Sequence, residues 1–140
     1  MVFLLSQLCL PLLEKAATEK VPSRIINIGS INGIAPPTLQ TFAYSSSKAA
    51  LHHLSKHLAS TLASRHITVN AVAPGPFETK MLAGILDQGR DAIISTTALG
   101  RLGCETDMGG VCVFLSSRAG AYITGDVIVV DGGSLIKSLL

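Results

Sequence analysis

The chain has 140 residues and a net charge of +2, with 48% hydrophobic and 14% charged residues. It carries no basic run, which argues against binding to nucleic acid or to an anionic membrane surface. A chain of this length forms one domain with a real core, and its apolar composition favours strands buried on both faces, as in a parallel α/β sheet.

The amino-terminal stretch MVFLLSQLCLPLL predicts a helix that continues to about Thr18, with Pro11 as a point where it can kink. The alternative is the apolar part of a secretory signal. However, no Lys or Arg precedes the stretch, and it is too short to cross a bilayer. A helix is therefore favoured over a signal peptide and over a membrane span.

A predicted strand and a long predicted helix follow. The strand runs from Arg24 to Ile28 and leads through Gly29 to Ser30 in a loop. The helix covers about Ala43 to Ser64, because leucines recur at helical spacing at positions 51, 54, 58 and 62. The helix therefore returns the chain along the first strand.

Tyr44 and Lys48 stand at i and i+4 near the start of this helix, so their side chains share one face. A free phenol has a pKa of about 10, and a fixed cation nearby favours the phenolate. Such a phenol can give a proton to a carbonyl oxygen or take one from an alcohol, while Ser30 hydrogen-bonds the same oxygen. By itself the spacing also suits a packed tyrosine and an exposed lysine, so the interpretation depends on its context.

The second predicted strand, Ile67 to Ala73, ends at Pro74-Gly75. Strands that alternate with helix-length connections predict a parallel sheet with helices on both faces. Ligands of such sheets bind outside the carboxyl ends of the strands. Ser30 and Pro74-Gly75 each follow such an end, so we expect them at the same edge. A further helix over about Thr106 to Leu115 and a last strand from Asp126 to Val130 complete the predicted elements.

No metal site is expected. Cys9, Cys104 and Cys112 are scattered, without zinc spacing, and we expect them to be reduced, buried thiols in a cytoplasmic protein. His53 and His57 stand at i and i+4, but no third ligand lies near them, and a solvated helix face is the favoured interpretation.

Four segments, in their order along the chain, resemble the short-chain dehydrogenase/reductase family: GS…YSSSK, ITVNAVAPGPFET, GRLG and AYITGDVIVVDGG. They extend from about Arg24 to Gly133. Within the family the likeness is to the classical 3-oxoacyl-carrier-protein reductase type and to reductases grouped with rhamnolipid synthesis. The resemblance implies a Rossmann-type fold and a hydride transfer. The hydride passes between NADP, or NAD as the alternative, and a small-molecule carbonyl or secondary alcohol. A 3-oxoacyl group is one such substrate.

The resemblance also implies roles for individual residues. Ser30 is expected as the partner of the oxyanion, Tyr44 as the acid/base, and Lys48 as the group that stabilises the phenolate. Tyr44 and Lys48 are further expected to bind the coenzyme, with Lys48 on its ribose.

The loop after the second strand is assigned by the same resemblance to the nicotinamide end of the coenzyme. Gly75 lets backbone approach a flat ligand, and Pro74 stiffens the loop. The main chain of Phe77 is expected at the carboxamide, with the Thr79 hydroxyl beside it. The stretch from Thr79 to Thr97 is expected to form one or two short helices that cover the substrate.

The glycine-rich turn by which this family grips the coenzyme does not precede Ser30, and the 29 residues before it are too few for a βαβαβ unit. We therefore expect residues 1–140 to be a single partial domain, the carboxyl-terminal catalytic half of a truncated Rossmann-type sheet. Three hypotheses stay open: a fragment of an active reductase, a catalytically inactive form that docks onto a full-length relative, and a small self-sufficient enzyme. Family members form oligomers, so a homo-oligomer is expected as well.

Overall fold

Three parallel strands form the sheet in the computed structural model, which describes residues 1–37, 40–79 and 89–137. The strands are β1 (Ser23–Ile28), β2 (Ile67–Pro74) and β3 (Val127–Val130), with β2 in the middle. The register places Ile28 opposite Val72 and Pro74 opposite Val130, so the strands end at the same edge. The expected parallel, Rossmann-like α/β sheet is confirmed.

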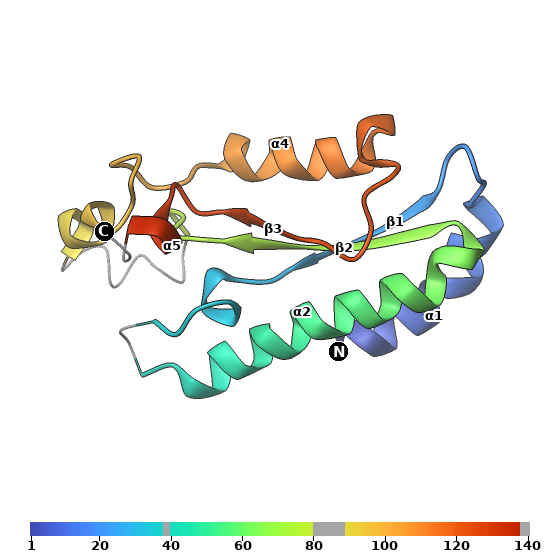
Figure 1. The fold of residues 1–140 in the computed structure, drawn as a ribbon, viewed down its shortest axis with the longest axis horizontal. Helices are drawn as coiled ribbons and strands as arrows, with labels where there is room; N and C mark the ends of the chain where they lie inside the picture. Colours follow the sequence, from blue (N-terminus) through green and yellow to red (C-terminus); the bar gives the residue numbers. More distant parts are fainter. Residues whose placement is uncertain (38–39, 80–88, 138–140) are drawn as a thin grey trace.

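Helices cover both faces of this sheet (Figure 1). α1 (Val2–Ala16) and α2 (Phe42–Leu62) lie on one face, and α4 (Glu105–Ser116) lies on the other. The shorter elements of the described chain are η1 (Ile31–Gly33), η2 (Ala63–Arg65), η3 (Arg118–Gly120), α5 (Ser134–Lys137) and a helical segment over residues 89–95. Figure 1 shows α5 and the segment 89–95 beyond the carboxyl ends of the strands, where the parallel order predicts a ligand site.

The predicted ends of two elements differ slightly from the observed ones, and local hydrogen bonds explain why. α1 ends at Ala16 rather than near Thr18, because Ala17 is extended and the Thr18 N–H donates to the Val21 carbonyl at 3.0 Å. β3 begins at Val127 rather than at the preceding aspartate, whose side chain accepts the Val127 N–H at 2.8 Å. A turn after Ala16 thus ends α1, and the Asp126 side chain sets the start of β3.

The core lies between β2 and the two helices on one face of the sheet. β2 is buried along nearly all its length, as expected for a strand covered on both faces, whereas β1 and β3 are only partly buried. The buried cluster consists of Ala59, Leu62, Ile67 and Val69, with Leu10, Leu13, Ala17, Ile25 and Leu58 packed against it. Each large aliphatic side chain buried there contributes about 1.5–3 kcal/mol to stability.

The three cysteines are unpaired, but the expectation that they are buried is wrong. Cys104 is exposed because it caps the start of α4, and Cys9 and Cys112 are partly exposed. His53 and His57 are both exposed on α2, as expected for a solvated face, with ring centroids 5.3 Å apart. Within residues 1–37, 40–79 and 89–137, no helix is long and apolar enough to cross a membrane.

Candidate active site

The carboxyl edge of the sheet brings together the two loops that the sequence assigned to one site. The Gly29 N–H donates to the Val72 carbonyl at 2.7 Å, so the loop that carries Ser30 begins beside β2. The Gly75 N–H donates to the Val130 carbonyl at 3.0 Å, which fixes the second loop beside β3. Ser30 and Pro74-Gly75 therefore lie at the same edge, as predicted.

Ser30 lies at the start of η1, and its backbone geometry orients the side chain. It is the N-cap of that turn, and its Oγ accepts the Asn32 N–H at 3.2 Å. Its own N–H donates to Nε2 of His52 at 3.4 Å, and the residue is only 6% exposed. A hydroxyl has one proton and two lone pairs, so Oγ keeps its proton to donate to another group.

Tyr44 and Lys48 lie together on α2, next to the end of β1. The Lys48 Nζ is 5.6 Å from the centroid of the Tyr44 ring and donates to the Ile28 carbonyl at 2.9 Å. Both side chains are partly exposed. The carbonyl of β1 thus holds the ammonium beside the phenol, one residue before Gly29. Among the described residues no hydrogen bond joins Ser30 to Tyr44.

A line of polar and small side chains on α2 continues this arrangement toward the core. His52, Ser55, Ala59 and Leu62 are the buried residues of the helix, at helical spacing after Lys48. The Asn27 side-chain amide donates to the Ser55 Oγ at 2.9 Å, which ties β1 to α2 in the interior. The leucine stripe read from the sequence is therefore not the buried face, although Leu62 belongs to both lines.

His52 and Ser55 were not predicted from the sequence as parts of the site. The available signal was their spacing, since positions 44, 48, 52 and 55 repeat at four, four and three residues and share one helix face. The histidines were considered only as metal ligands, and His52 was not connected with Ser30.

The loop after β2 is packed closely against β3 and the segment before α4. A Cβ on Gly75 would lie 2.7 Å from the Cα of Asp131, so this glycine admits the end of β3. The structure thus gives Gly75 a packing role against the end of β3, and its approach to a ligand stays a prediction. Phe77 pairs with Gly103 in an isolated bridge, and its ring occupies the space of the absent Gly103 side chain.

The Phe77 main chain keeps groups that point away from this bridge. The Pro76 carbonyl accepts the Gly103 N–H at 3.0 Å, and the Glu78 N–H donates to the Gly103 carbonyl at 3.4 Å. Successive peptide groups of an extended segment point to opposite sides, so the N–H and carbonyl of Phe77 face away from Gly103.

Thr79 is exposed at the end of the described loop, and residues 80–88 of the predicted lid lie outside the described residues. An ion pair joins the segments on either side of it. The Arg90 guanidinium donates to both carboxylate oxygens of Glu78, at 3.0 and 2.9 Å. This hydrogen bonding, together with the charge of Arg90, holds the pKa of the Glu78 carboxyl below its ordinary value.

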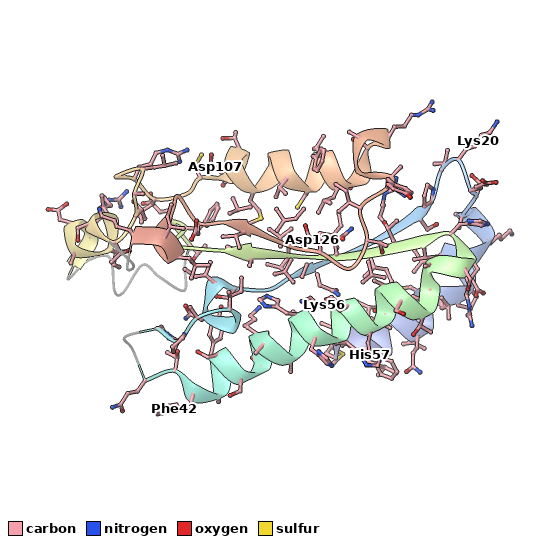
Figure 2. The ribbon with its side chains drawn as sticks, in the orientation of Figure 1. Lys20, Phe42, Lys56, His57, Asp107 and Asp126 are labelled. Carbon is pink, nitrogen blue, oxygen red and sulfur yellow. The ribbon has the colours of Figure 1, made fainter. Side chains whose placement is uncertain are left out.

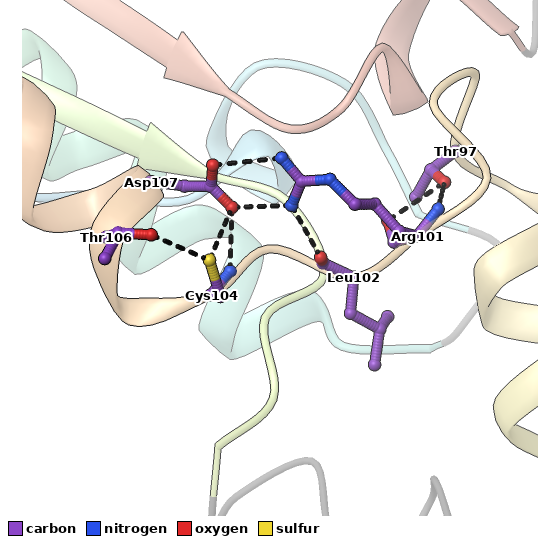
Figure 3. Close-up of polar contacts among 6 residues, drawn as sticks. All are labelled: Thr97, Arg101, Leu102, Cys104, Thr106 and Asp107. Atoms are coloured by element: carbon purple, nitrogen blue, oxygen red, sulfur yellow. Dashed lines mark hydrogen bonds and ion pairs between the residues drawn. The ribbon is translucent and has the colours of Figure 1, made fainter.

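A polar network joins side chains and backbone groups before and at the start of α4 (Figure 3). Gly103, the bridge partner of Phe77, belongs to the same segment. Arg101 donates to both carboxylate oxygens of Asp107, at 2.7 and 3.0 Å, and the Cys104 N–H donates to the same carboxylate at 2.9 Å. These hydrogen bonds, the one from Arg101 first, hold the pKa of Asp107 well below its ordinary value. Figure 2 places Asp107 at the start of α4, across the sheet from Phe42 on α2.

The network lines a small pocket together with the second loop. The lining residues are Pro76, Phe77, Leu99, Arg101, Gly103, Asp107, Val130, Asp131 and Gly132. Polar groups of this pocket are hydrogen-bonded within the protein. The Arg101 side chain also donates to the Leu102 carbonyl at 3.0 Å, and the Arg101 backbone N–H donates to Thr97 Oγ1 at 3.2 Å.

Comparison with known proteins gives consistent matches over nearly the whole chain. The family model described as Enoyl-(Acyl carrier protein) reductase matches residues 2–134. The rhamnolipids biosynthesis 3-oxoacyl-acyl-carrier-protein reductase of Pseudomonas aeruginosa is 44% identical over 134 residues, which cover 94% of this chain and 52% of that protein. The chain thus spans about half the length of the curated relatives that it matches.

Solved structures agree in fold and in coverage. The Pseudomonas aeruginosa RhlG/NADP active-site complex matches with a TM-score of 0.89 and 43% identity, over 95% of this chain and 54% of that one. A short-chain type dehydrogenase/reductase from Mycobacterium marinum matches with a TM-score of 0.84 and 33% identity, over 95% of this chain and 51% of that one.

Proposed function

The chain belongs to the short-chain dehydrogenase/reductase family, and on that premise we propose that it carries the catalytic half of an NADP-dependent reductase. The substrate class that we propose is a small carbonyl compound or secondary alcohol, with 3-oxoacyl groups first. The names of the relatives support this, since the Pseudomonas aeruginosa relative is a 3-oxoacyl-acyl-carrier-protein reductase and the matching solved structure from that organism is a complex with NADP. We treat residues 1–140 as one partial coenzyme-binding domain.

The position of the Lys48 ammonium is the observation that carries the proposal. It lies 2.9 Å from the Ile28 carbonyl and 5.6 Å from the Tyr44 ring centroid, at the edge where ligands of parallel sheets bind. An ammonium has three N–H groups, and the Ile28 carbonyl takes one of them. The other two are left for the phenolate and for a ribose hydroxyl.

The residues at this edge fit the nicotinamide end of the coenzyme. Lys48 supplies donors, and the Phe77 main chain supplies a donor and an acceptor that face away from Gly103. Pro74 and Gly75 begin that loop at the end of β2, and Thr79 ends its described part. When bound, NADPH would supply the hydride. Tyr44, Lys48, Pro74, Gly75, Phe77 and Thr79 are the residues that we propose to hold it.

In the proposed reaction, the chain's own residues handle the oxygen and the proton. The Ser30 hydroxyl donates a hydrogen bond to the carbonyl oxygen of the substrate and so orients it. The Tyr44 hydroxyl then gives its proton to that oxygen as the carbonyl carbon is reduced. The Lys48 charge stabilises the phenolate left behind, and the same groups act in reverse when an alcohol is oxidised.

Thermal unfolding of the 140-residue chain with and without millimolar NADPH tests the proposal. Ligand at 100 times its dissociation constant adds about 2.7 kcal/mol to the free energy of unfolding, enough to raise Tm by several degrees. Replacing Lys48 with Met should reduce this shift, whereas Lys56→Met, on the same helix, should not. Oxidation of NADPH by a 3-oxoacyl thioester measures turnover, and a chain that unfolds cooperatively but gives neither response would contradict the proposal.

A second candidate function is docking onto a full-length reductase, or onto another copy of this chain. Apolar side chains of α1 support it, because they are exposed on one helix: Phe3, Leu4, Leu5, Leu8 and Leu12. β1 is also an edge strand of the described sheet, and such edges and patches favour association. Sedimentation with the full-length P. aeruginosa relative tests this: Leu8→Asp should abolish co-sedimentation, and Val113→Asp, on α4, should not.

The state of the cysteines indicates a cellular compartment. Cys9, Cys104 and Cys112 are all unpaired, which suits a reducing environment. We therefore expect the protein to act in the cytoplasm, and recovery of a tagged chain in the cytoplasmic fraction is the result that would support it.

A further inference from the structure

His52 lies in the buried seam between α2 and the loop that carries Ser30. It follows Lys48 by one helical turn and is only 6% exposed. Its Nε2 accepts the Ser30 backbone N–H at 3.4 Å. A neutral imidazole has one donor and one acceptor nitrogen, so the proton of this ring must lie on Nδ1.

The loop is shaped around the ring by two glycines. A Cβ on Gly29 would lie 2.1 Å from Nε2 of His52, and a Cβ on Gly33 would lie 2.9 Å from its Cε1. Both distances are far below a normal contact. The imidazole therefore fills the space of the absent Gly29 side chain, and at Gly33 it shares that space with the backbone of Lys48 and Ala49, so the loop has little freedom to shift.

We propose that His52 is a positioning residue that holds Ser30 at the carboxyl edge of the sheet, and that it does so only while the imidazole is neutral. The effect of His52 on catalysis rests on the proposed function, in which the Ser30 hydroxyl orients the substrate carbonyl. The protonated ring would direct an N–H at the N–H of Ser30. Two donors cannot pair, so the hydrogen bond would be lost and the loop released.

The surroundings of the ring keep it neutral near pH 7. Burial, first of all, lowers the pKa of His52, a hydrogen bond with the Gly33 backbone raises it, and the charges of Lys48 and Lys56 lower it. Within the described part of the chain these two lysines, both on α2, are the charged groups that act on the ring. Ser30, Gly33 and Asn27, from the elements packed against α2, are uncharged. Protonation is therefore expected only below the ordinary value of 6.5.

NMR spectroscopy of the full ¹⁵N-labelled chain tests the proposal without any need for turnover. Long-range imidazole correlations should show the Nδ1–H tautomer of His52 at neutral pH. As the pH is lowered, the Ser30 amide resonance should shift with the same midpoint as the His52 ring, below 6.5. A Ser30 amide that does not follow the ring, or an Nε2–H tautomer, would overturn the proposal.

Two substitutions of His52 distinguish the effect of its hydrogen bond to Ser30 from the effect of its packing. Gln can supply an acceptor near the position of Nε2, so His52→Gln should keep the Ser30 amide protected from exchange. His52→Leu keeps an apolar side chain but no acceptor, and exchange at Ser30 should rise about tenfold. His53→Gln, at the exposed neighbouring position, is the matched control and should change neither signal. Equal protection in His52→Leu and wild type would contradict the proposal.

Failure of the positioning role of His52 can be distinguished from failure of the proposed function. If the chain turns over, His52→Leu should lower kcat and leave the KM for NADPH unchanged, and kcat should fall below pH 6.5 with the His52 midpoint. If Ser30 follows His52 but Tyr44→Phe retains full turnover, the positioning role stands and the proposed mechanism fails.

Discussion

The side-chain amide of Asn27 donates a hydrogen bond to the hydroxyl of Ser55 at 2.9 Å, in the interior between β1 and α2. Ser55 is completely buried, and its own hydroxyl donates to the Leu51 carbonyl at 2.8 Å. The pair fixes the helix that carries Tyr44 and Lys48 against the strand that leads to Ser30. The site is thus held together by a polar contact that touches no proposed ligand.

We predict that Ser55→Ala lowers the free energy of unfolding by about 1–3 kcal/mol, because the buried Asn27 amide is left without its acceptor. Urea unfolding measures the loss. Ser60→Ala, at an exposed position of the same helix, is the control and should change the stability little. An equal loss in both variants would mean that the serine hydroxyls act on the helix alone.

Tyr44→Phe should lower turnover of a 3-oxoacyl thioester by about 10²- to 10⁴-fold, the usual contribution of a general acid. NADPH binding, measured by the shift in Tm, should weaken much less than turnover, because Lys48 and the Phe77 main chain keep their proposed contacts with the coenzyme. Tyr122→Phe removes the same hydroxyl from a fully exposed position and is the control. Retained turnover in Tyr44→Phe would refute the acid/base role.

Gly29→Ala should destabilise the chain by about 1–3 kcal/mol, because the new methyl group overlaps the imidazole of His52. Adding His52→Ala should recover part of that loss, and the double-mutant cycle measures the coupling. Gly109→Ala, in α4, meets nothing within 4 Å and should instead stabilise the chain, by up to about 1 kcal/mol. Purely additive effects of Gly29→Ala and His52→Ala would show that the ring does not fill this space.

Asp107→Asn should lower Tm at neutral pH, because it removes the ion pair with Arg101 at the start of α4. The pKa of Asp107 in the folded chain lies well below its ordinary value of 3.8. The charged form therefore contributes stability that is present above pH 3.8 and is lost as the pH falls through the lower, folded value. The difference in Tm between wild type and Asp107→Asn should therefore disappear over that pH range.

Tm measured from pH 7 down to acid checks this prediction. Glu105→Gln, in the same first turn of α4 but outside the ion pair with Arg101, is the control. A gap that stays constant as the pH falls would show that Asp107 acts through its shape and not through its charge.

Most of the fold could be predicted from the sequence, because the strands and helices have regular patterns. β1 and β2 were placed within a residue of their observed ends, and their parallel order put Ser30 and Gly75 at one edge. Details that depend on tertiary packing were missed. The exposed Cys104 is an example, since it caps α4 through contacts with Asp107.

The candidate site could be predicted only where its residues are close in sequence. Tyr44 and Lys48 share a helix face by spacing alone, and the structure keeps them together. The role of His52 depends on how α2 meets the loop after β1, which spacing does not determine. The leucines predicted a neighbouring face of α2 as the buried one, whereas the buried line includes the small residues Ser55 and Ala59.

The closeness of Tyr44 to Lys48 also has an optical consequence. The chain has two tyrosines and no tryptophan. Tyr122 is fully exposed, whereas Tyr44 is partly buried beside an ammonium. In a chain with Tyr122→Phe, all tyrosine absorption and fluorescence come from Tyr44. The ionisation of that single phenol then becomes directly visible in the near ultraviolet, with no added label.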